Sequence, residues 1–287
     1  MATIGQWVQG ARPRTLPAAL VPVVVATAAA TADGHFIWDR AVLALVVSLA
    51  IQVATNYAND YSDGKRGTDD KRVGPMRLVA SGAAAPKVVL YAALACFGIA
   101  GIAGLALAVM TSWILILVGA LALLAGWFYT GGKRPYGYMG LGEVFVFVFF
   151  GLVAVVGTYY VQTGGVGYSL LLSVPVGLLA VALLVINNLR DIPTDAASGK
   201  MTLAVRLGDR GTRYFYVGVI VLSLLLAVAL SAYRPFAWLG VLAAPLALRP
   251  TRVVMAGATG PELIRALAMT GALQIAFGVL LSLGVLL

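Results

Sequence analysis

Residues 168–195 read YSLLLSVPVGLLAVALLVINNLRDIPTD, a long apolar stretch that ends in a cluster of amides and carboxylates. The apolar part is long enough to cross a bilayer as a helix, which needs roughly 20 mostly apolar residues. Similar stretches recur along the 287 residues, of which 61% are hydrophobic and 11% are charged, whereas soluble domains have about 25% charged residues. The composition therefore predicts an all-α, polytopic membrane protein, with residues 1–287 forming one membrane domain.

Nine segments have the length and hydropathy expected of membrane-spanning helices. They are residues 15–32, 39–60, 87–109, 111–129, 141–162, 168–189, 212–232, 235–249 and 264–286. The strands of a membrane barrel would alternate in polarity, which these segments do not. Each is therefore expected to be a helix, because a helix satisfies its own backbone hydrogen bonds in lipid. The eighth segment is the shortest and contains Pro245.

Basic side chains are distributed very unevenly between the two sides of these segments. Of the 20 lysines and arginines, 18 fall in the N-terminal segment and in the loops 61–87, 130–140, 190–213 and 249–265. Lysine and arginine are enriched in cytoplasmic loops, so we predict a multi-pass protein of the cell membrane with a cytoplasmic N-terminus. The net charge of +9 lies in loops between apolar spans, and it therefore does not indicate a nucleic-acid partner.

Two polar clusters, NYANDYSD at 56–63 and NNLRDIPTD at 187–195, end two of the apolar stretches. Both fall on the predicted cytoplasmic side, and together they hold four of the 11 acidic residues. Carboxylates beside a bilayer are costly unless they are paired, hydrated or bound to a cation. With one cysteine and one histidine in the chain, a metal site made of those residues is excluded.

The spacing within each cluster places oxygen-bearing side chains on one face of a helix, although Pro193 could end the second helix and leave Asp195 in the following loop. Such oxygens suit Mg²⁺, which binds through a few carboxylates together with substrate phosphates. We predict that the metal ligands are Asn56, Asp60, Asp63, Asn188, Asp191 and Asp195. The predicted catalytic residues are the four acids Asp60, Asp63, Asp191 and Asp195. The simpler interpretation is that these side chains cap helices and pair with nearby arginines.

Basic residues next to the clusters could clamp a diphosphate, arginine in bidentate fashion and lysine as a point charge. These candidates are Lys65, Arg66, Arg72, Lys133, Arg134, Arg190 and Lys200. The loop 129–138, YTGGKRPYGY, lacks the Gly-Lys-Ser/Thr order of a phosphate loop, and the simpler interpretation of its glycines is that they turn the chain. Its terminal tyrosines could line a pocket for a ring or a cation. The predicted substrate-pocket residues are Asn59, Tyr129, Tyr138 and Asn187.

Several of these segments, in this order, resemble the UbiA-type intramembrane aromatic prenyltransferases. The likeness rests on NYANDYSD at 56–63, GTD at 67–69, GPMR at 74–77, RPYGYMGLGE at 134–143, NNLRD at 187–191 and GKMTLAVRLG at 199–208. Many members of the family have aspartate where this chain has Gly67 and Asn187. These two departures resemble the branch that prenylates a naphthoate ring, and they leave open which oxygens replace the missing carboxylates.

The resemblance implies a helix bundle with a lateral cavity that is open to lipid. It also implies Mg²⁺-dependent transfer of a polyprenyl chain from polyprenyl diphosphate to 1,4-dihydroxy-2-naphthoate, with loss of the ring carboxylate, to give demethylmenaquinone after oxidation. In that chemistry the metal would neutralise the leaving diphosphate. Tyr129 or Tyr138 would face the allylic cation. Arg12 or Arg14 would hold the carboxylate of the acceptor, unless these arginines only anchor the chain at the membrane surface.

Two other functions fit parts of the sequence. The same fold could use another acceptor, such as 4-hydroxybenzoate, homogentisate, a haem or a sugar phosphate. An ion-coupled secondary transporter is the alternative from another class. The sites of such transporters usually lie near the bilayer midplane, whereas the acidic residues here gather at one surface.

Overall fold

The computed structural model describes residues 2–68 and 74–287, and within them the regular secondary structure is entirely helical. The α-helices are α1 (Ile4–Gly10), α2 (Pro17–Ala32), α3 (Trp38–Arg66), α4 (Pro86–Met110), α5 (Ile114–Phe128), α6 (Gly142–Val146), α7 (Ala154–Thr163), α8 (Ser169–Ala197), α9 (Leu203–Ala229), α10 (Ala244–Met255) and α11 (Gly260–Leu286). Short 3₁₀ segments are η1 (Pro13–Thr15), η2 (Tyr136–Met139), η4 (Leu230–Ala232) and η5 (Ala237–Ala243), and η3 (Phe147–Val153) is a π-helix between α6 and α7.

Among the residues that the structure describes, six helices are long and apolar enough to cross a membrane, which makes this a multi-pass membrane protein. They are α3, α4, the continuous segment Gly142–Thr163, α8, the segment Leu203–Ala232 and α11. The pair Ile4–Thr15 and Pro17–Ala32, bent by 55°, would count as a seventh, and α5 is a shorter apolar helix. The expected eighth span is divided between η5 and α10, so the total of nine spans stays a prediction.

Prolines and glycines mark several helix ends. Pro17 and Pro86 occupy the first turn of α2 and α4, where the missing N–H has no intrahelical partner to lose. Gly67 and Gly164 end α3 and α7 in the left-handed conformation, with φ of 73° and 76°, which glycine adopts without a steric cost.

Helices α3 and α8 both extend beyond their expected ends, and this carries each polar cluster on a helical turn. The idea that Pro193 ends the second helix is wrong, because α8 continues to Ala197 and includes Asp195. Pro193 lies on the exposed side of this last turn of α8, whereas Asp191 and Asp195 lie on its buried side. The contacts that keep the turn helical are therefore made on the buried side. The hydroxyls of Thr194 and Ser198 also donate to carbonyls of this last turn.

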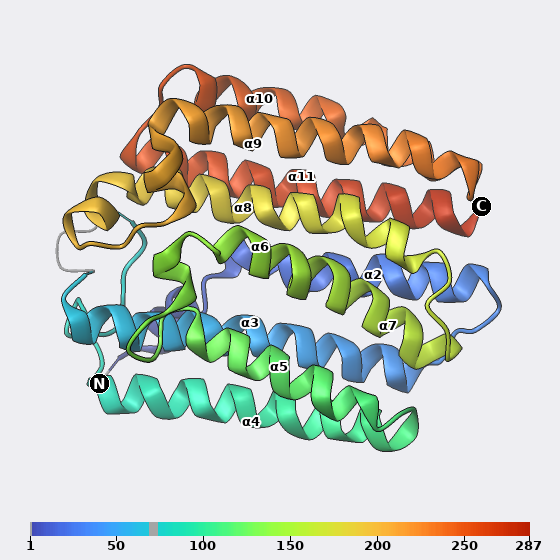
Figure 1. The fold of residues 1–287 in the computed structure, drawn as a ribbon, viewed down its shortest axis with the longest axis horizontal. Coiled ribbons are helices and arrows are strands. Elements are labelled where there is room, and N and C mark those ends of the chain that lie inside the picture. Colours follow the sequence, from blue (N-terminus) through green and yellow to red (C-terminus); the bar gives the residue numbers. More distant parts are fainter. Residues whose placement is uncertain (1, 69–73) are drawn as a thin grey trace.

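Helix α8 lies at the centre of the bundle. Of the residues in its most apolar stretch, 72% are buried, compared with 33% in that of α3. Helix α8 packs against α2, α9 and α11 in the largest of the apolar clusters. On the other side of the bundle, α3 packs against α4 and α5 (Figure 1). Helix α7 packs against α2, and contacts between α5 and α7 are sparse. The bundle is therefore tightly closed around α8 and loosely closed between α5 and α7.

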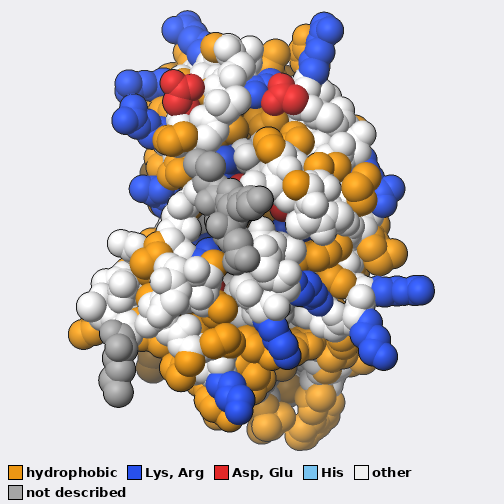
Figure 2. All heavy atoms as spheres, turned by 90° about the vertical axis from the view of Figure 1, so that its left-hand side faces the viewer, with side chains coloured by type: hydrophobic (Ala, Val, Ile, Leu, Met, Phe, Trp, Pro, Cys, Tyr) orange, Lys and Arg blue, Asp and Glu red, His pale blue; other side chains and the backbone are white. Residues whose placement is uncertain are grey.

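The two ends of the bundle differ in character. Residues 74–85, the 129–141 connection and the loop after α8 lie with the N-terminal end of the chain at the left-hand end in Figure 1, and the C-terminus lies at the other end. Figure 2 looks onto that left-hand end and shows lysine and arginine side chains spread across it. The loops that the charge distribution predicts to be cytoplasmic thus share one end of the molecule.

Candidate active site

A cavity of about 250 Å³ enters the bundle between the two polar clusters. It is lined by side chains from α2, α3, α4, α5, α8 and the α6–α7 segment. The charged and amide side chains of the lining belong to the two polar clusters and to segments beside them; they are Arg12, Gln52, Asn56, Asn59, Asp63, Arg77, Asn187, Asn188, Asp191 and Lys200. The rest of the lining is mostly apolar. The cavity therefore joins a charged mouth to an apolar interior.

Asp63 is the acid of the first cluster that lines the cavity. It is 3% exposed, and its Oδ1 accepts a hydrogen bond of 2.7 Å from the hydroxyl of Tyr138. Burial, followed by the negative charge of Asp63 and the hydrogen bond to it, raises the pKa of Tyr138 above its ordinary value. Tyr138 therefore keeps its proton at neutral pH and acts as a donor to Asp63.

Asp191 is the acid of the second cluster that lines the cavity. Its two oxygens accept bonds of 2.8 Å from Nε and from NH2 of Arg190. The same NH2 group donates to Oδ1 of Asn187 at 2.6 Å. Arg190 is itself buried. Its two hydrogen bonds to the Asp191 carboxylate therefore fix the orientation of that carboxylate.

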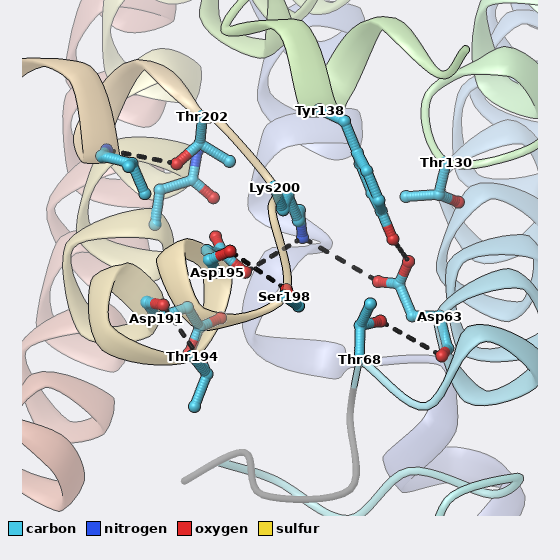
Figure 3. Close-up of polar contacts among 12 residues, drawn as sticks. Asp63, Thr68, Thr130, Tyr138, Asp191, Thr194, Asp195, Ser198, Lys200 and Thr202 are labelled. Carbon is cyan, nitrogen blue, oxygen red and sulfur yellow. Dashed lines mark hydrogen bonds and ion pairs between the residues drawn. The ribbon is translucent and has the colours of Figure 1, made fainter.

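Lys200 bridges the two clusters (Figure 3). Its Nζ lies 3.9 Å from Oδ2 of Asp63 and 3.4 Å from Oδ1 of Asp195. It also lies 5.3 Å from the centre of the Tyr138 ring, as does the guanidinium of Arg66. Oδ2 of Asp195 is buried and accepts no hydrogen bond from the described residues. Lys200 therefore places a positive charge between acids that come from two different helices.

Asp60 has a different role from Asp63. It is fully buried, and its oxygens accept hydrogen bonds of 2.7 Å from Leu78 N and 3.0 Å from Val79 N. It is not among the residues that line the cavity. Asp60 therefore anchors the connection between α3 and α4 to the end of α3, and its predicted role as a metal ligand stays a prediction.

Asn56 lines the cavity, but its side chain holds the N-terminal segment. Its Nδ2 donates to Ala11 O at 2.9 Å and to Thr15 Oγ1 at 3.3 Å, and its backbone O accepts from Arg12 at 3.3 Å. Arg12 has φ of 55°, an uncommon conformation for a residue with a side chain. Arg12 lines the cavity, whereas Arg14 is exposed and is not part of the lining.

The other predicted diphosphate ligands are scattered. Arg190 supports Asp191, and Lys65, Lys133 and Arg134 are exposed and do not line the cavity. Arg66 is also exposed, and its guanidinium donates to the carbonyls of Thr130 and Gly132. Arg72 lies outside the described residues. Lys200 is thus the one residue of this predicted set that lines the cavity among those the structure describes.

The predicted substrate-pocket residues divide in the same way. Asn59, Tyr129 and Asn187 line the cavity, and Oδ1 of Asn59 accepts a bond of 2.7 Å from Thr130. Tyr138 does not line it and instead positions Asp63.

An aromatic wall at the mouth includes Tyr136, which the sequence analysis did not select. Its ring stacks on Phe145 with centroids 3.8 Å apart and meets Tyr129 edge-on at 5.6 Å. All three rings line the cavity. Tyr136 belongs to the YTGGKRPYGY loop, whose terminal tyrosines were predicted to line the pocket. Its place between those tyrosines could have indicated the same role.

Two charged residues were also missed as site residues. Arg77 lines the cavity and lies in the GPMR segment, so its motif was the available signal. Glu143 is 4% exposed, its Oε1 accepts a bond of 2.9 Å from Nδ2 of Asn188, and its Oε2 is buried without a hydrogen-bond partner among the described residues. Because the side-chain nitrogen of Asn188 donates to Glu143, the side-chain oxygen of Asn188 points away from Glu143.

Comparison with known families identifies this arrangement. Residues 19–270 match the model of the UbiA prenyltransferase family. The chain belongs to the UbiA prenyltransferase family. Its relatives include 1,4-dihydroxy-2-naphthoate octaprenyltransferases. That of Mycobacterium tuberculosis is 52% identical, over 94% of this chain and 93% of that protein. That of Escherichia coli is 38% identical, over 87% of this chain and 84% of that protein.

Solved UbiA structures share the fold at low sequence identity. The apo UbiA homologue from Aeropyrum pernix is 17% identical, with a TM-score of 0.72 over 91% of this chain and 95% of that one. The UbiA homologue from Archaeoglobus fulgidus bound to GPP and Mg²⁺ is 14% identical, with a TM-score of 0.66 over 96% of this chain and 99% of that one. A divalent metal therefore has a precedent in this family.

The residues at the mouth fit a metal that is shared with a diphosphate. Within residues 2–68 and 74–287, no three acidic, histidine or cysteine side chains gather into a site made of protein ligands alone. Mg²⁺ does not need such a cage, because it usually keeps waters and binds one or two carboxylates together with phosphate oxygens. The carboxylates of Asp63 and Asp191, one from each side of the cavity, match that requirement.

Proposed function

We propose that this protein transfers a polyprenyl chain from polyprenyl diphosphate to 1,4-dihydroxy-2-naphthoate, with loss of the carboxylate, in a Mg²⁺-dependent reaction that yields demethylmenaquinone after oxidation. The observation that carries the proposal is that Asp63 of α3 and Asp191 of α8 line the mouth of one cavity whose interior is apolar. The mouth suits a metal-bound diphosphate and the interior suits an isoprenoid chain. The naphthoate octaprenyltransferases that are 52% and 38% identical support the choice of acceptor.

The residues that would hold Mg²⁺ are Asp63 and Asp191, with the amide oxygens of Asn59 and Asn188 beside them in the lining. When bound, the metal supplies positive charge that stabilises the leaving diphosphate as the carbon–oxygen bond breaks. Lys200 lies between the clusters, so its ammonium can contact a diphosphate oxygen there and add to the same stabilisation.

The departing diphosphate takes the bonding electron pair and leaves an allylic cation, which water would destroy. The rings of Tyr129, Tyr136 and Phe145 cover this part of the cavity. They exclude water, and their faces attract a cation. The ring carbon that bears the carboxylate then attacks the allylic cation and forms the new carbon–carbon bond, and the bond from this carbon to the carboxylate breaks and returns its electron pair to the ring. Because loss of CO₂ restores the aromatic ring, the chemistry needs no strong base from the protein.

Arg12 is the candidate that we favour for the carboxylate of the acceptor. It lines the cavity, unlike Arg14, and its segment is fixed by Asn56. A guanidinium can bind a carboxylate in bidentate fashion. The site would face the cytoplasm, because the basic loops surround this end of the bundle and such loops are typically cytoplasmic.

The test uses purified protein with Mg²⁺, octaprenyl diphosphate and a panel of aromatic acids, and the products are identified by mass. We expect a product only from 1,4-dihydroxy-2-naphthoate, lighter by CO₂ than a simple adduct, with release of pyrophosphate. A product that retains the carboxylate, or that forms from 4-hydroxybenzoate or homogentisate instead, would contradict the proposal. Substrate movement without pyrophosphate release would favour a transporter.

A further inference from the structure

Three helix glycines line the apolar part of the cavity without an evident packing reason. They are Gly104 of α4, Gly119 of α5 and Gly157 of α7. A Cβ at Gly119 or Gly157 would meet no atom within 4 Å, and one at Gly104 would meet only Val47 at 3.9 Å. None of the three has a positive φ, so the backbone would accept another residue.

Two other glycines of the bundle, Gly151 and Gly126, are explained by close packing. A Cβ at Gly151 would lie 2.8 Å from the Cα of Gly177, and one at Gly126 would lie 2.8 Å from Oγ1 of Thr55. Glycine inside a helix is destabilising relative to alanine, because it loses more backbone freedom on folding. At Gly151 and Gly126 close approach between helices offsets that cost, whereas Gly119 and Gly157 gain only empty space beside the cavity.

The empty space lies beside α5 and α7, two helices with few contacts between them. Helices α5 and α7 both pack against α3, while contacts between α5 and α7 themselves are sparse. Gly119 and Gly157 are half-buried, which places them neither in the closed core nor fully outside the bundle. A side chain at either position would project into the loosely closed part of the cavity.

These positions are far from the reacting end. Gly119 lies about 15 Å along α5 from Tyr129 at the mouth, at 1.5 Å per residue. Val47, beside Gly104, lies about 24 Å along α3 from Asp63 by the same measure. Gly157 lies about 21 Å from Glu143 along the continuous segment Gly142–Thr163 by the same measure. A bulky side chain at Gly119 or Gly157 would therefore leave the diphosphate and the first isoprenoid unit untouched and would meet only the later units of a long donor.

We propose that Gly119 and Gly157 determine specificity for the length of the donor, by keeping open the passage that the distal isoprenoid units occupy between α5 and α7. This inference rests on the proposed prenyl transfer and adds to it the residues that select the length of the donor. The glycines act by leaving volume free, so that any larger side chain there selects for shorter chains.

The experiment compares kcat/KM for octaprenyl diphosphate and geranyl diphosphate in Gly119→Leu and Gly157→Leu. We expect the long-to-short ratio to fall at least tenfold, while geranyl transfer stays within threefold of wild type. Gly98→Leu is the matched control, because Gly98 is an exposed helix glycine of α4 with nothing within 4 Å and no place in the cavity lining. A ratio within twofold of wild type in both active variants would overturn the inference.

A second measurement does not require a bulky variant to fold. Gly119→Cys in a Cys96→Ala background is alkylated with a maleimide, with Gly98→Cys as the control. Octaprenyl diphosphate is expected to slow the labelling of Gly119→Cys at least tenfold, and geranyl diphosphate is expected to leave it unchanged. Equal labelling rates with both donors would contradict the inference. If the wild-type protein prenylates another acceptor, the proposed function fails, yet both measurements can still be made with that acceptor.

Discussion

The two polar clusters have nearly the same spacing of acids, but the structure uses their acids differently. In the first, Asp63 lines the cavity while Asp60 is bound by the backbone of Leu78 and Val79. In the second, Asp191 lines the cavity and Asp195 meets Lys200. Each cluster therefore presents one acid to the cavity and commits the other to holding a neighbouring segment. A spacing of three or four residues on a helix places two side chains on one face, but it does not decide what each of them contacts.

The largest expected effect comes from removing one cavity-facing acid from either cluster. Asp63→Asn and Asp191→Asn should each lower kcat by about 10²–10³, the usual cost of losing one group that stabilises developing charge. EDTA should abolish wild-type activity, and added Mg²⁺ should restore it. Glu262→Gln is the control, because Glu262 is an exposed acid at the start of α11. Near-normal rates in either aspartate variant would show that the cluster does not serve the reaction.

Lys200 should have the next largest effect, because it links the clusters. Lys200→Ala is expected to raise the KM for the donor diphosphate about tenfold, and Lys200→Arg should recover much of that loss. The thermal stability of the ligand-free protein should also fall in Lys200→Ala, since Asp63 and Asp195 would then lose a counter-charge. A change confined to the KM of the naphthoate would place Lys200 with the acceptor instead.

Asp60 separates anchoring from metal binding. Asp60→Ala leaves the N–H groups of Leu78 and Val79 without their acceptor, and each buried unsatisfied group costs about 1–3 kcal/mol. We expect Asp60→Ala to unfold at a lower temperature than the wild type. The activity that remains should depend on Mg²⁺ concentration in the same way as wild-type activity. If Asp60→Ala shifts the Mg²⁺ requirement as far as Asp63→Asn does, Asp60 is a metal ligand after all.

Glu143 tests how the second cluster is oriented. Glu143→Gln keeps an oxygen that can accept from Asn188, and its rate should stay within about fivefold of wild type. Glu143→Ala removes that acceptor and should lower the rate about tenfold and raise the Mg²⁺ concentration needed for half-maximal activity. A Gln variant as impaired as the Ala variant would mean that the charge of Glu143 matters more than its hydrogen bond.

The smallest effect is expected at Tyr138, whose hydroxyl positions Asp63 in the first cluster. Tyr138→Phe removes one hydrogen bond, worth about 0.5–1.5 kcal/mol or somewhat more to a charged acceptor, so a loss of a few-fold is expected. The raised pKa of Tyr138 means that its phenol does not ionise near neutral pH. The pH–rate profiles of variant and wild type should therefore coincide between pH 7 and 9, and a new slope there would assign Tyr138 a proton-transfer role.

The sequence by itself determined the membrane class and the grouping of polar loops at one end, because hydropathy and charge are local properties of the chain. It also located Asp63, Asn188 and Asp191, since helical spacing follows from backbone geometry. Only the tertiary structure separated Asp60 from Asp63, brought Arg12 to the cavity and left Lys133 and Arg134 outside it. The partners of these residues lie on other segments, and such contacts depend on how the helices pack. The open space at Gly119 and Gly157 is likewise a property of the gap between α5 and α7, which no local pattern of residues records.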